Sequence, residues 1–200
     1  MDELVQLELW RQLVVFVPLG IMLLVSAWTD FRHRKVYNKV TYPAFFVGVV
    51  AHGIAFGWAG LGWGLLAAVV MLVIGLFMLP FGWIGGGDVK LLTAAAAFLG
   101  LKGLAQLSFY SVLVGAAGGL LIALLNGYLW DMLARMFRYI RGWLRFLVYR
   151  TKEVREPLER DERSFIPFAI SVFLGGVIAW VDAVYGWPGL WDIFARAFQT

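Results

Sequence analysis

Charged residues are missing from the central part of this 200-residue chain, and this limits what it can fold into. Between residues 40 and 87 there is no Asp, Glu, Lys or Arg, and only 15% of the whole chain is charged. Soluble domains carry about 25% charged residues, because their surface has to be hydrated. A transmembrane helix instead needs roughly 20 mostly apolar residues. The chain is therefore predicted to lie in a bilayer.

The few charges divide the chain into apolar segments. We expect helices over residues 12–29, 41–57, 63–80, 88–100, 104–125 and 164–181. Turns are expected near residues 58–62 and 100–103. The predicted fold is all-α: a polytopic membrane protein with six transmembrane helices in a single domain over residues 1–200. The chain has no Cys and two separate histidines, so we expect no disulfide and no metal site.

The basic residues predict an orientation for these helices. With the N-terminus outside, 14 of the 17 Lys and Arg residues fall in cytoplasmic loops, as the positive-inside rule requires. Both termini are then outside. The net charge of +4 is explained by topology, and we expect no nucleic-acid partner.

A basic and amphipathic segment is expected at about residues 129–163. Between residues 129 and 148 apolar side chains recur every three or four positions, with arginines among them. This pattern is typical of a helix lying in the membrane interface, in contact with lipid headgroups. The alternative is a continuation of the helix over residues 104–125.

Two aspartates stand apart from the other acidic residues. Asp30 closes the first predicted helix and Asp88 opens the fourth, so the topology brings both to the cytoplasmic face. A carboxylate in a bilayer is costly, which makes both functional candidates. Two neighbouring carboxylates share a proton, so one can act as base and the other as acid. The helix ends favour Asp88 as the base and Asp30 as the acid.

Each aspartate also has a structural interpretation. Asp88 could cap its helix after the glycines at 85–87, and Asp30 could form a salt bridge with Arg32 or Arg34. The three glycines permit a backbone that a substrate strand can approach closely.

Three segments resemble a known family. Gly-Gly-Gly-Asp-Val-Lys at residues 85–90 is similar to the GxGDxK motif of the type IV prepilin leader peptidases and the archaeal preflagellin peptidases, which are GxGD intramembrane aspartic proteases. Residues 30–38 resemble the first-aspartate segment of that family. Residues 166–169, Ile-Pro-Phe-Ala, resemble the segment that begins the last helix in that family. The resemblance covers nearly the whole chain.

The resemblance implies an endopeptidase of the cytoplasmic (inner) membrane that cuts short basic leaders from prepilins, pseudopilins or preflagellins. It implies that Asp30 and Asp88 are the catalytic residues and that the enzyme uses no cofactor. Many members also N-methylate the product and carry a cysteine-containing N-terminal region; this chain is similar to the compact form without that region, and methylation is not expected of it. The remaining site residues are the supporting loop, Gly85, Gly86, Gly87 and Lys90, and contacts to substrate or lipid at Arg32, Arg34 and Asn38.

Two other functions stay open. A small proton-coupled or ion-coupled carrier could use Asp30 and Asp88, but it predicts acidic residues at several depths, and the predicted mid-helix segments contain none. A non-catalytic pilus assembly factor could keep the same fold. Cleavage of a substrate with a basic leader distinguishes the peptidase from both.

Overall fold

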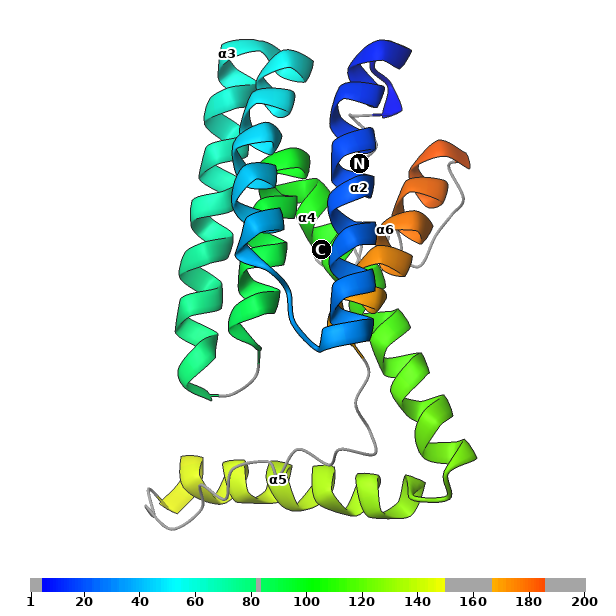
Figure 1. Ribbon diagram of the computed structural model, residues 1–200. Coiled ribbons are helices and arrows are strands. Elements are labelled where there is room, and N and C mark those ends of the chain that lie inside the picture. The colour runs from blue at the N-terminus through cyan, green and yellow to red at the C-terminus, as the bar shows by residue number, and fades with distance from the viewer. Residues whose placement is uncertain (1–4, 82–83, 150–166, 186–200) are drawn as a thin grey trace. The chain divides into compact units, whose positions relative to one another are not determined.

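The computed structural model describes residues 5–81, 84–149 and 167–185, and these residues form helices and no strand. The predicted all-α fold is confirmed for this part of the chain (Figure 1). The elements in chain order are α2 (Leu9–His33), α3 (Asn38–Met78), the short 3-10 helix η1 (Leu79–Phe81), α4 (Gly86–Leu125), α5 (Leu129–Tyr149) and α6 (Phe168–Tyr185).

Four of these helices, α2, α3, α4 and α6, are long and apolar enough to cross a membrane. Two of them are longer than one crossing requires. α3 has 41 residues and α4 has 40, so either would measure about 60 Å if straight, twice the roughly 30 Å hydrocarbon core. Neither is straight.

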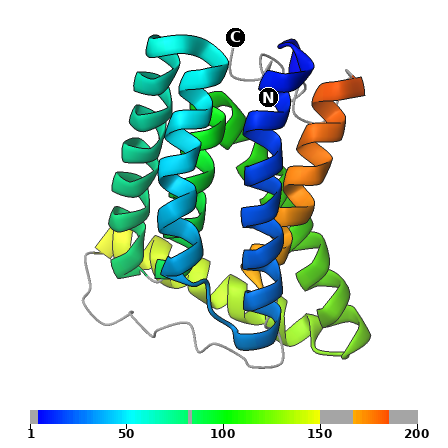
Figure 2. The same cartoon turned by 45° about the horizontal axis from the view of Figure 1, so that its top comes forward.

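A single glycine interrupts each of the two long helices. Gly57 in α3 has φ 75° and ψ −163°, and Gly100 in α4 has φ 67° and ψ −176°. Only glycine adopts this backbone without strain. A Cβ built on Gly64 would lie 3.2 Å from the Cβ of His52, although twelve residues of straight helix span about 18 Å. α3 therefore doubles back on itself, as both views show (Figures 1 and 2).

These interruptions fall where the sequence predicts helix ends, at residues 57 and 100. α3 thus consists of arms over residues 38–56 and 58–78, and α4 of arms over residues 86–99 and 101–125. Side chains from other segments bond carbonyl groups just before each interruption. Arg11 Nη1 donates to the Ala55 carbonyl at 3.3 Å, and His52 Nδ1 lies 2.9 Å from the Phe98 carbonyl. Such bonds satisfy backbone groups that a helix end leaves without a partner.

The chain divides into two compact units, residues 1–114 with 167–200, and residues 115–166. In the first unit, the arm of α4 over residues 86–99 is the buried centre, since every residue from Ala94 to Leu99 is less than 5% exposed. Small residues let the neighbouring helices approach it. A Cβ on Gly48 would lie 2.8 Å from the Phe98 ring, and Gly75 contacts Val89.

In the second unit, α5 is a separate helix. α4 ends at Leu125, and Gly127, with φ 71°, lies in the turn before α5 begins at Leu129. A separate helix, α5 (Leu129–Tyr149), lies where the sequence predicts one, so the alternative of a continuous helix is wrong, while its place in the membrane interface stays a prediction. The large side chains of Trp130, Phe137 and Ile140 are exposed. The rest of the basic segment, from residue 150, lies outside the described residues.

The last helix is the least well predicted. It was expected over residues 164–181, whereas α6 covers Phe168–Tyr185, and residues up to 166 lie outside the described part. The extension past residue 181 places Asp182 inside the helix. An acidic residue among apolar ones does not stop a helix when neighbouring side chains hydrogen-bond it.

Candidate active site

Asp30 lies in the last turn of α2 and is only 6% exposed. Its Oδ2 accepts a hydrogen bond from the backbone N–H of Ala169, at 3.1 Å. Ala169 lies in the first turn of α6, where free N–H groups and the helix dipole favour a negative charge. The carboxylate at the unfavourable end of its own helix is thus stabilised by the favourable end of another.

Asp88 is the third residue of α4, and its Oδ2 accepts a hydrogen bond from the backbone N–H of Gly85 at 3.2 Å. Gly85 is the residue immediately before the helix. This is the side-chain half of a capping box, in which the third helical residue reaches back to the residue before the helix. The interpretation of Asp88 as the N-cap residue is therefore wrong, because Gly85 occupies that position and Asp88 bonds it from the third helical residue.

The loop that follows α2, which carries Asp30, packs against the start of α4, which carries Asp88. A Cβ on Gly87 would lie 3.3 Å from the Cβ of Val36. Lys90 Nζ donates to Asn38 Oδ1 at 2.9 Å and lies 5.9 Å from the centre of the Tyr42 ring. The start of α4 is therefore held against the segment that follows Asp30.

The predicted site residues are gathered at one end of the first unit. The end of α2 and the starts of α3, α4 and α6 all lie there (Figures 1 and 2). Asp30, Asp88, the glycines at 85–87, Lys90 and Asn38 belong to these segments. The side chains of Arg32 and Arg34 are exposed at the same end of α2. This end thus carries two carboxylates, one of them buried, which is the set of groups that acid and base catalysis needs.

Two polar groups that hold α6 in place escape reasoning from sequence alone. The first is the Ala169 N–H, for which the available signal was Pro167, since proline is common at helix starts. The second is Asp182, whose Oδ2 accepts hydrogen bonds from Tyr110 Oη at 2.7 Å and Gln106 Nε2 at 3.1 Å. Asp182 is thirteen residues beyond Ala169 in α6, or about 20 Å along the helix. It joins α6 to α4 far from Asp30.

No cluster of three or more His, Asp or Glu side chains that could hold a metal ion occurs within the described ranges.

A profile of the type IV leader peptidase family matches residues 17–121, just over half of the chain. The matched region contains both aspartates and the glycines before Asp88. The chain belongs to the type IV leader peptidase family. Together with the four apolar helices, membership of this family indicates a multi-pass membrane protein.

A curated relative in this family is the prepilin leader peptidase/N-methyltransferase of Bacillus subtilis (strain 168). It is 34% identical over 120 residues, which make up 58% of this chain and 45% of the relative. The chain thus spans about half the length of this leader peptidase. No solved structure matches the chain significantly.

Proposed function

We propose that this chain is an aspartic endopeptidase of the cytoplasmic membrane that removes the basic leader of prepilins, pseudopilins or preflagellins. Asp30 and Asp88 are its catalytic residues. The observation that carries the proposal is the convergence of both aspartates at one end of the first unit, through the contacts of Val36 with Gly87 and of Asn38 with Lys90. Family membership supports the peptidase activity.

The two carboxylates divide the chemistry of hydrolysis. One, ionised, takes a proton from a water molecule as its oxygen attacks the scissile carbonyl carbon. The other, protonated, donates a hydrogen bond to the carbonyl oxygen, where negative charge develops. Each carboxylate accepts a hydrogen bond from a backbone N–H at the start of a helix. Helix dipoles therefore do not favour Asp88 over Asp30 as the base.

The glycines and Lys90 support Asp88. Gly87 allows close packing against Val36, because a side chain there would have to displace its neighbour. The Lys90 ammonium is held by Asn38 and lies near the Tyr42 ring. Exposed Arg32 and Arg34 remain candidates for contact with substrate or lipid.

The same proposal includes a topology of six crossings. The interruptions at Gly57 and Gly100 are placed outside, with both termini, and α5 lies in the cytoplasmic interface. The arm over residues 86–99 spans only about 21 Å. If its Gly100 end is at the outer surface, Asp88 lies below the inner surface, where a water-accessible site can be enclosed by helices.

The carrier alternative requires acidic residues at several depths, and Asp182 is one at a second depth in α6, but apolar residues lie between it and Asp30. This third carboxylate is bonded by Tyr110 and Gln106, and the apolar residues Phe173, Val177 and Trp180 separate it from Asp30 along α6. An ion path needs polar groups spaced along its length. Methylation of the product is not part of the proposal.

Purified protein in detergent, incubated with a prepilin that carries a basic leader, tests the proposal. We expect one cut that removes the leader, seen by mass spectrometry of both products. A known prepilin peptidase serves as the positive control. Absence of cleavage under conditions where that control is active would leave the carrier and the assembly factor as the remaining functions.

A further inference from the structure

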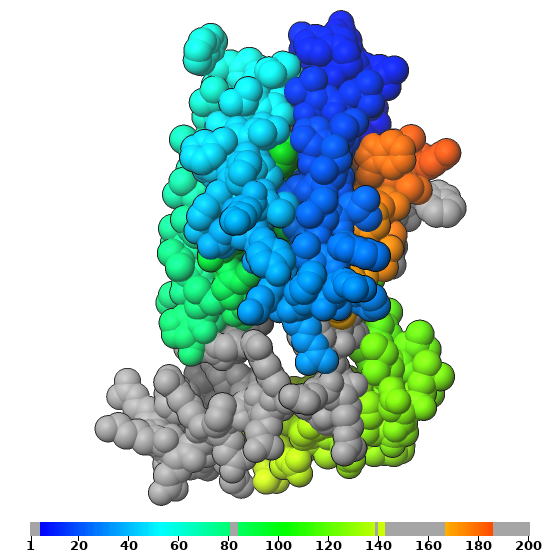
Figure 3. Space-filling model, viewed as in Figure 1, coloured from blue at the N-terminus to red at the C-terminus, as the bar shows by residue number. Residues whose placement is uncertain are grey.

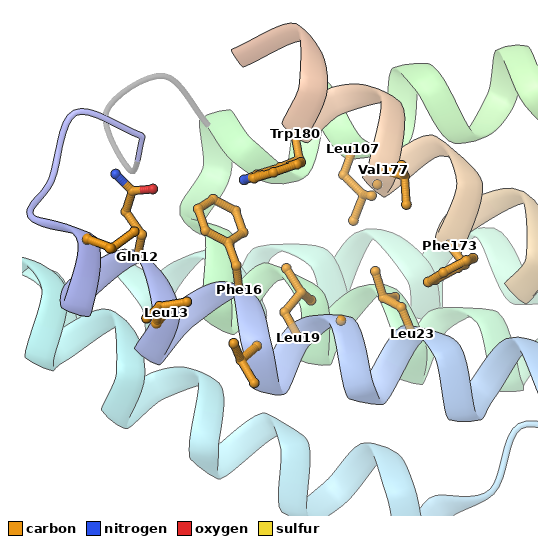
Figure 4. A pocket seen from close by; sticks show the side chains of 13 residues that line it. Gln12, Leu13, Phe16, Leu19, Leu23, Leu107, Phe173, Val177 and Trp180 are labelled. Carbon is orange, nitrogen blue, oxygen red and sulfur yellow. The ribbon is translucent and has the colours of Figure 1, made fainter. Parts of the chain in front are cut away.

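An apolar groove of about 350 Å³ runs between α2 and α6, with α4 behind it (Figure 4). In the space-filling view α2 and α6 lie side by side (Figure 3). Leu13, Val17 and Val177 line the groove and are roughly half exposed, so it opens to the surroundings of the helices. Among the described residues that line it, Gln12 alone has a polar amide, and this amide donates to the Val5 and Leu7 carbonyls.

The groove follows one face of each helix. Its α6 wall consists of Phe173, Gly176, Val177 and Trp180, the three- and four-residue spacing of a single helical face. The α2 wall extends from Leu9 to Leu23, about 21 Å along the axis. A groove of this length and direction matches most of one membrane crossing.

One end of the groove leads to the proposed catalytic residues. Leu23 and Phe173 line that end (Figure 4). One turn beyond Phe173 is Ala169, and two turns beyond Leu23 is Asp30, the pair joined by the hydrogen bond of 3.1 Å. A chain lying in the groove would meet the Asp30 carboxylate where it leaves the groove.

The groove also has one position, Gly20, at which another helix could approach closely. A Cβ built on Gly20 has no heavy atom within 4 Å. Small residues at such positions let a second helix pack closely in a membrane. A helix about 10 Å across cannot enter 350 Å³, so it would lie along the groove with one row of side chains inserted between α2 and α6.

We propose that this α2–α6 groove binds the transmembrane helix of the substrate and brings the scissile bond to Asp30. The inference rests on the proposed peptidase function and adds the surface that recognises the membrane-anchored part of the substrate. A phospholipid acyl chain is the competing occupant, and the cross-linking below separates it from a helix; what favours a helix is that the groove ends beside the pair formed by Ala169 and the Asp30 carboxylate. A peptide backbone N–H suits that carboxylate.

Cross-linking tests the groove without depending on catalysis. The chain contains no Cys, so single cysteines can be placed in the Asp88→Asn background. Leu13→Cys lies in the groove, and Ile21→Cys is the matched control, 58% exposed on the same helix but outside the groove. The probe is a synthetic substrate with a basic leader and a transmembrane helix carrying one Cys, reconstituted in the same vesicles.

We expect disulfide formation with the Leu13→Cys variant at least tenfold above that with Ile21→Cys. Equal yields at both positions, or none at Leu13→Cys, would overturn the proposal, and a groove filled by a lipid acyl chain gives one of these results. In the otherwise unchanged chain, Gly20→Leu and Val177→Trp should lower cleavage of this probe at least tenfold, and Gly62→Leu should not. Unchanged cleavage in both groove variants would also count against the groove.

The two proposals fail separately. If the Leu13→Cys variant forms the cross-link but the unchanged chain cleaves no substrate, the groove stays a helix-binding surface and the peptidase function is rejected.

Discussion

At the scale of single residues, the structure shows how a carboxylate can be kept buried at the end of α2. Asp30 stands at the negative end of its own helix dipole, but the Ala169 N–H at the start of α6 donates to it. Asp88 is held at the start of α4 by the N–H of Gly85. Both aspartates thus have backbone partners that orient them.

The bond between Lys90 and Asn38 gives a first residue-scale prediction. Because it joins the starts of α4 and α3, Lys90→Met and Asn38→Ala should each lower cleavage by about three- to tenfold, which corresponds to the loss of a typical hydrogen bond of about 0.5–1.5 kcal/mol. The double variant should cleave no more slowly than the less active of the two single variants. Initial rates of leader cleavage measure this, and losses that multiply in the double variant would show that the two residues act independently.

Residue-scale prediction from sequence reached the aspartates and glycines but not their partners. Charge is so scarce in this chain that two acids at matching helix ends are conspicuous. The Ala169 N–H is 139 residues from Asp30, and Asn38 is 52 residues from Lys90, so only the packed helices show these pairs. His52 and the Phe98 carbonyl, which lie within hydrogen-bond distance, are likewise 46 residues apart.

At the scale of elements, one glycine divides each of the two longest helices, α3 and α4, into two arms. Both glycines have a positive φ angle. The sequence predicted these turns because apolar runs of such length exceed one crossing and contain a glycine near their middle. The predicted end of the last helix, residue 181, falls short of Tyr185, because Asp182 does not end α6 and is bonded by Tyr110.

Replacing Gly57 tests the origin of the turn in α3. A Cβ there meets no heavy atom within 4 Å, so Gly57→Ala acts through backbone strain alone. We expect a loss of about 1–3 kcal/mol in stability, measured as a lower midpoint of thermal unfolding in detergent. Gly62→Ala is the matched control, because Gly62 also has open space but lies in a regular helix. Equal midpoints for the two variants would contradict the strain argument.

At the scale of the whole molecule, the positions of the few charged residues predict the membrane topology. Fourteen of the 17 basic residues lie in three proposed cytoplasmic loops, and the aspartates converge at the end of the first unit that this orientation places inside. Six crossings could be proposed from sequence because each rests on an apolar run bounded by charge or glycine.

Labelling of single cysteines tests this topology. Lys35→Cys, in the loop after α2, should react with a membrane-impermeant maleimide only after the cytoplasmic side is opened. Trp58→Cys, directly after the interruption of α3, should react from outside in intact cells; Trp58 is 90% exposed in the structure. If α3 crossed the membrane as one straight helix, Trp58→Cys would lie within the bilayer and stay unlabelled from both sides.

The central claim is that Asp30 and Asp88 act together in peptide hydrolysis, and their replacement by asparagine tests it most directly. Asp182→Asn is the matched control, since Asp182 also lies in a membrane helix but about 20 Å from Ala169 along α6. With all variants inserted and folded, we predict that Asp30→Asn and Asp88→Asn each lower the rate of leader cleavage by at least about a hundredfold. The Asp182→Asn variant should keep most of the activity. Appreciable cleavage by either catalytic variant would contradict the account.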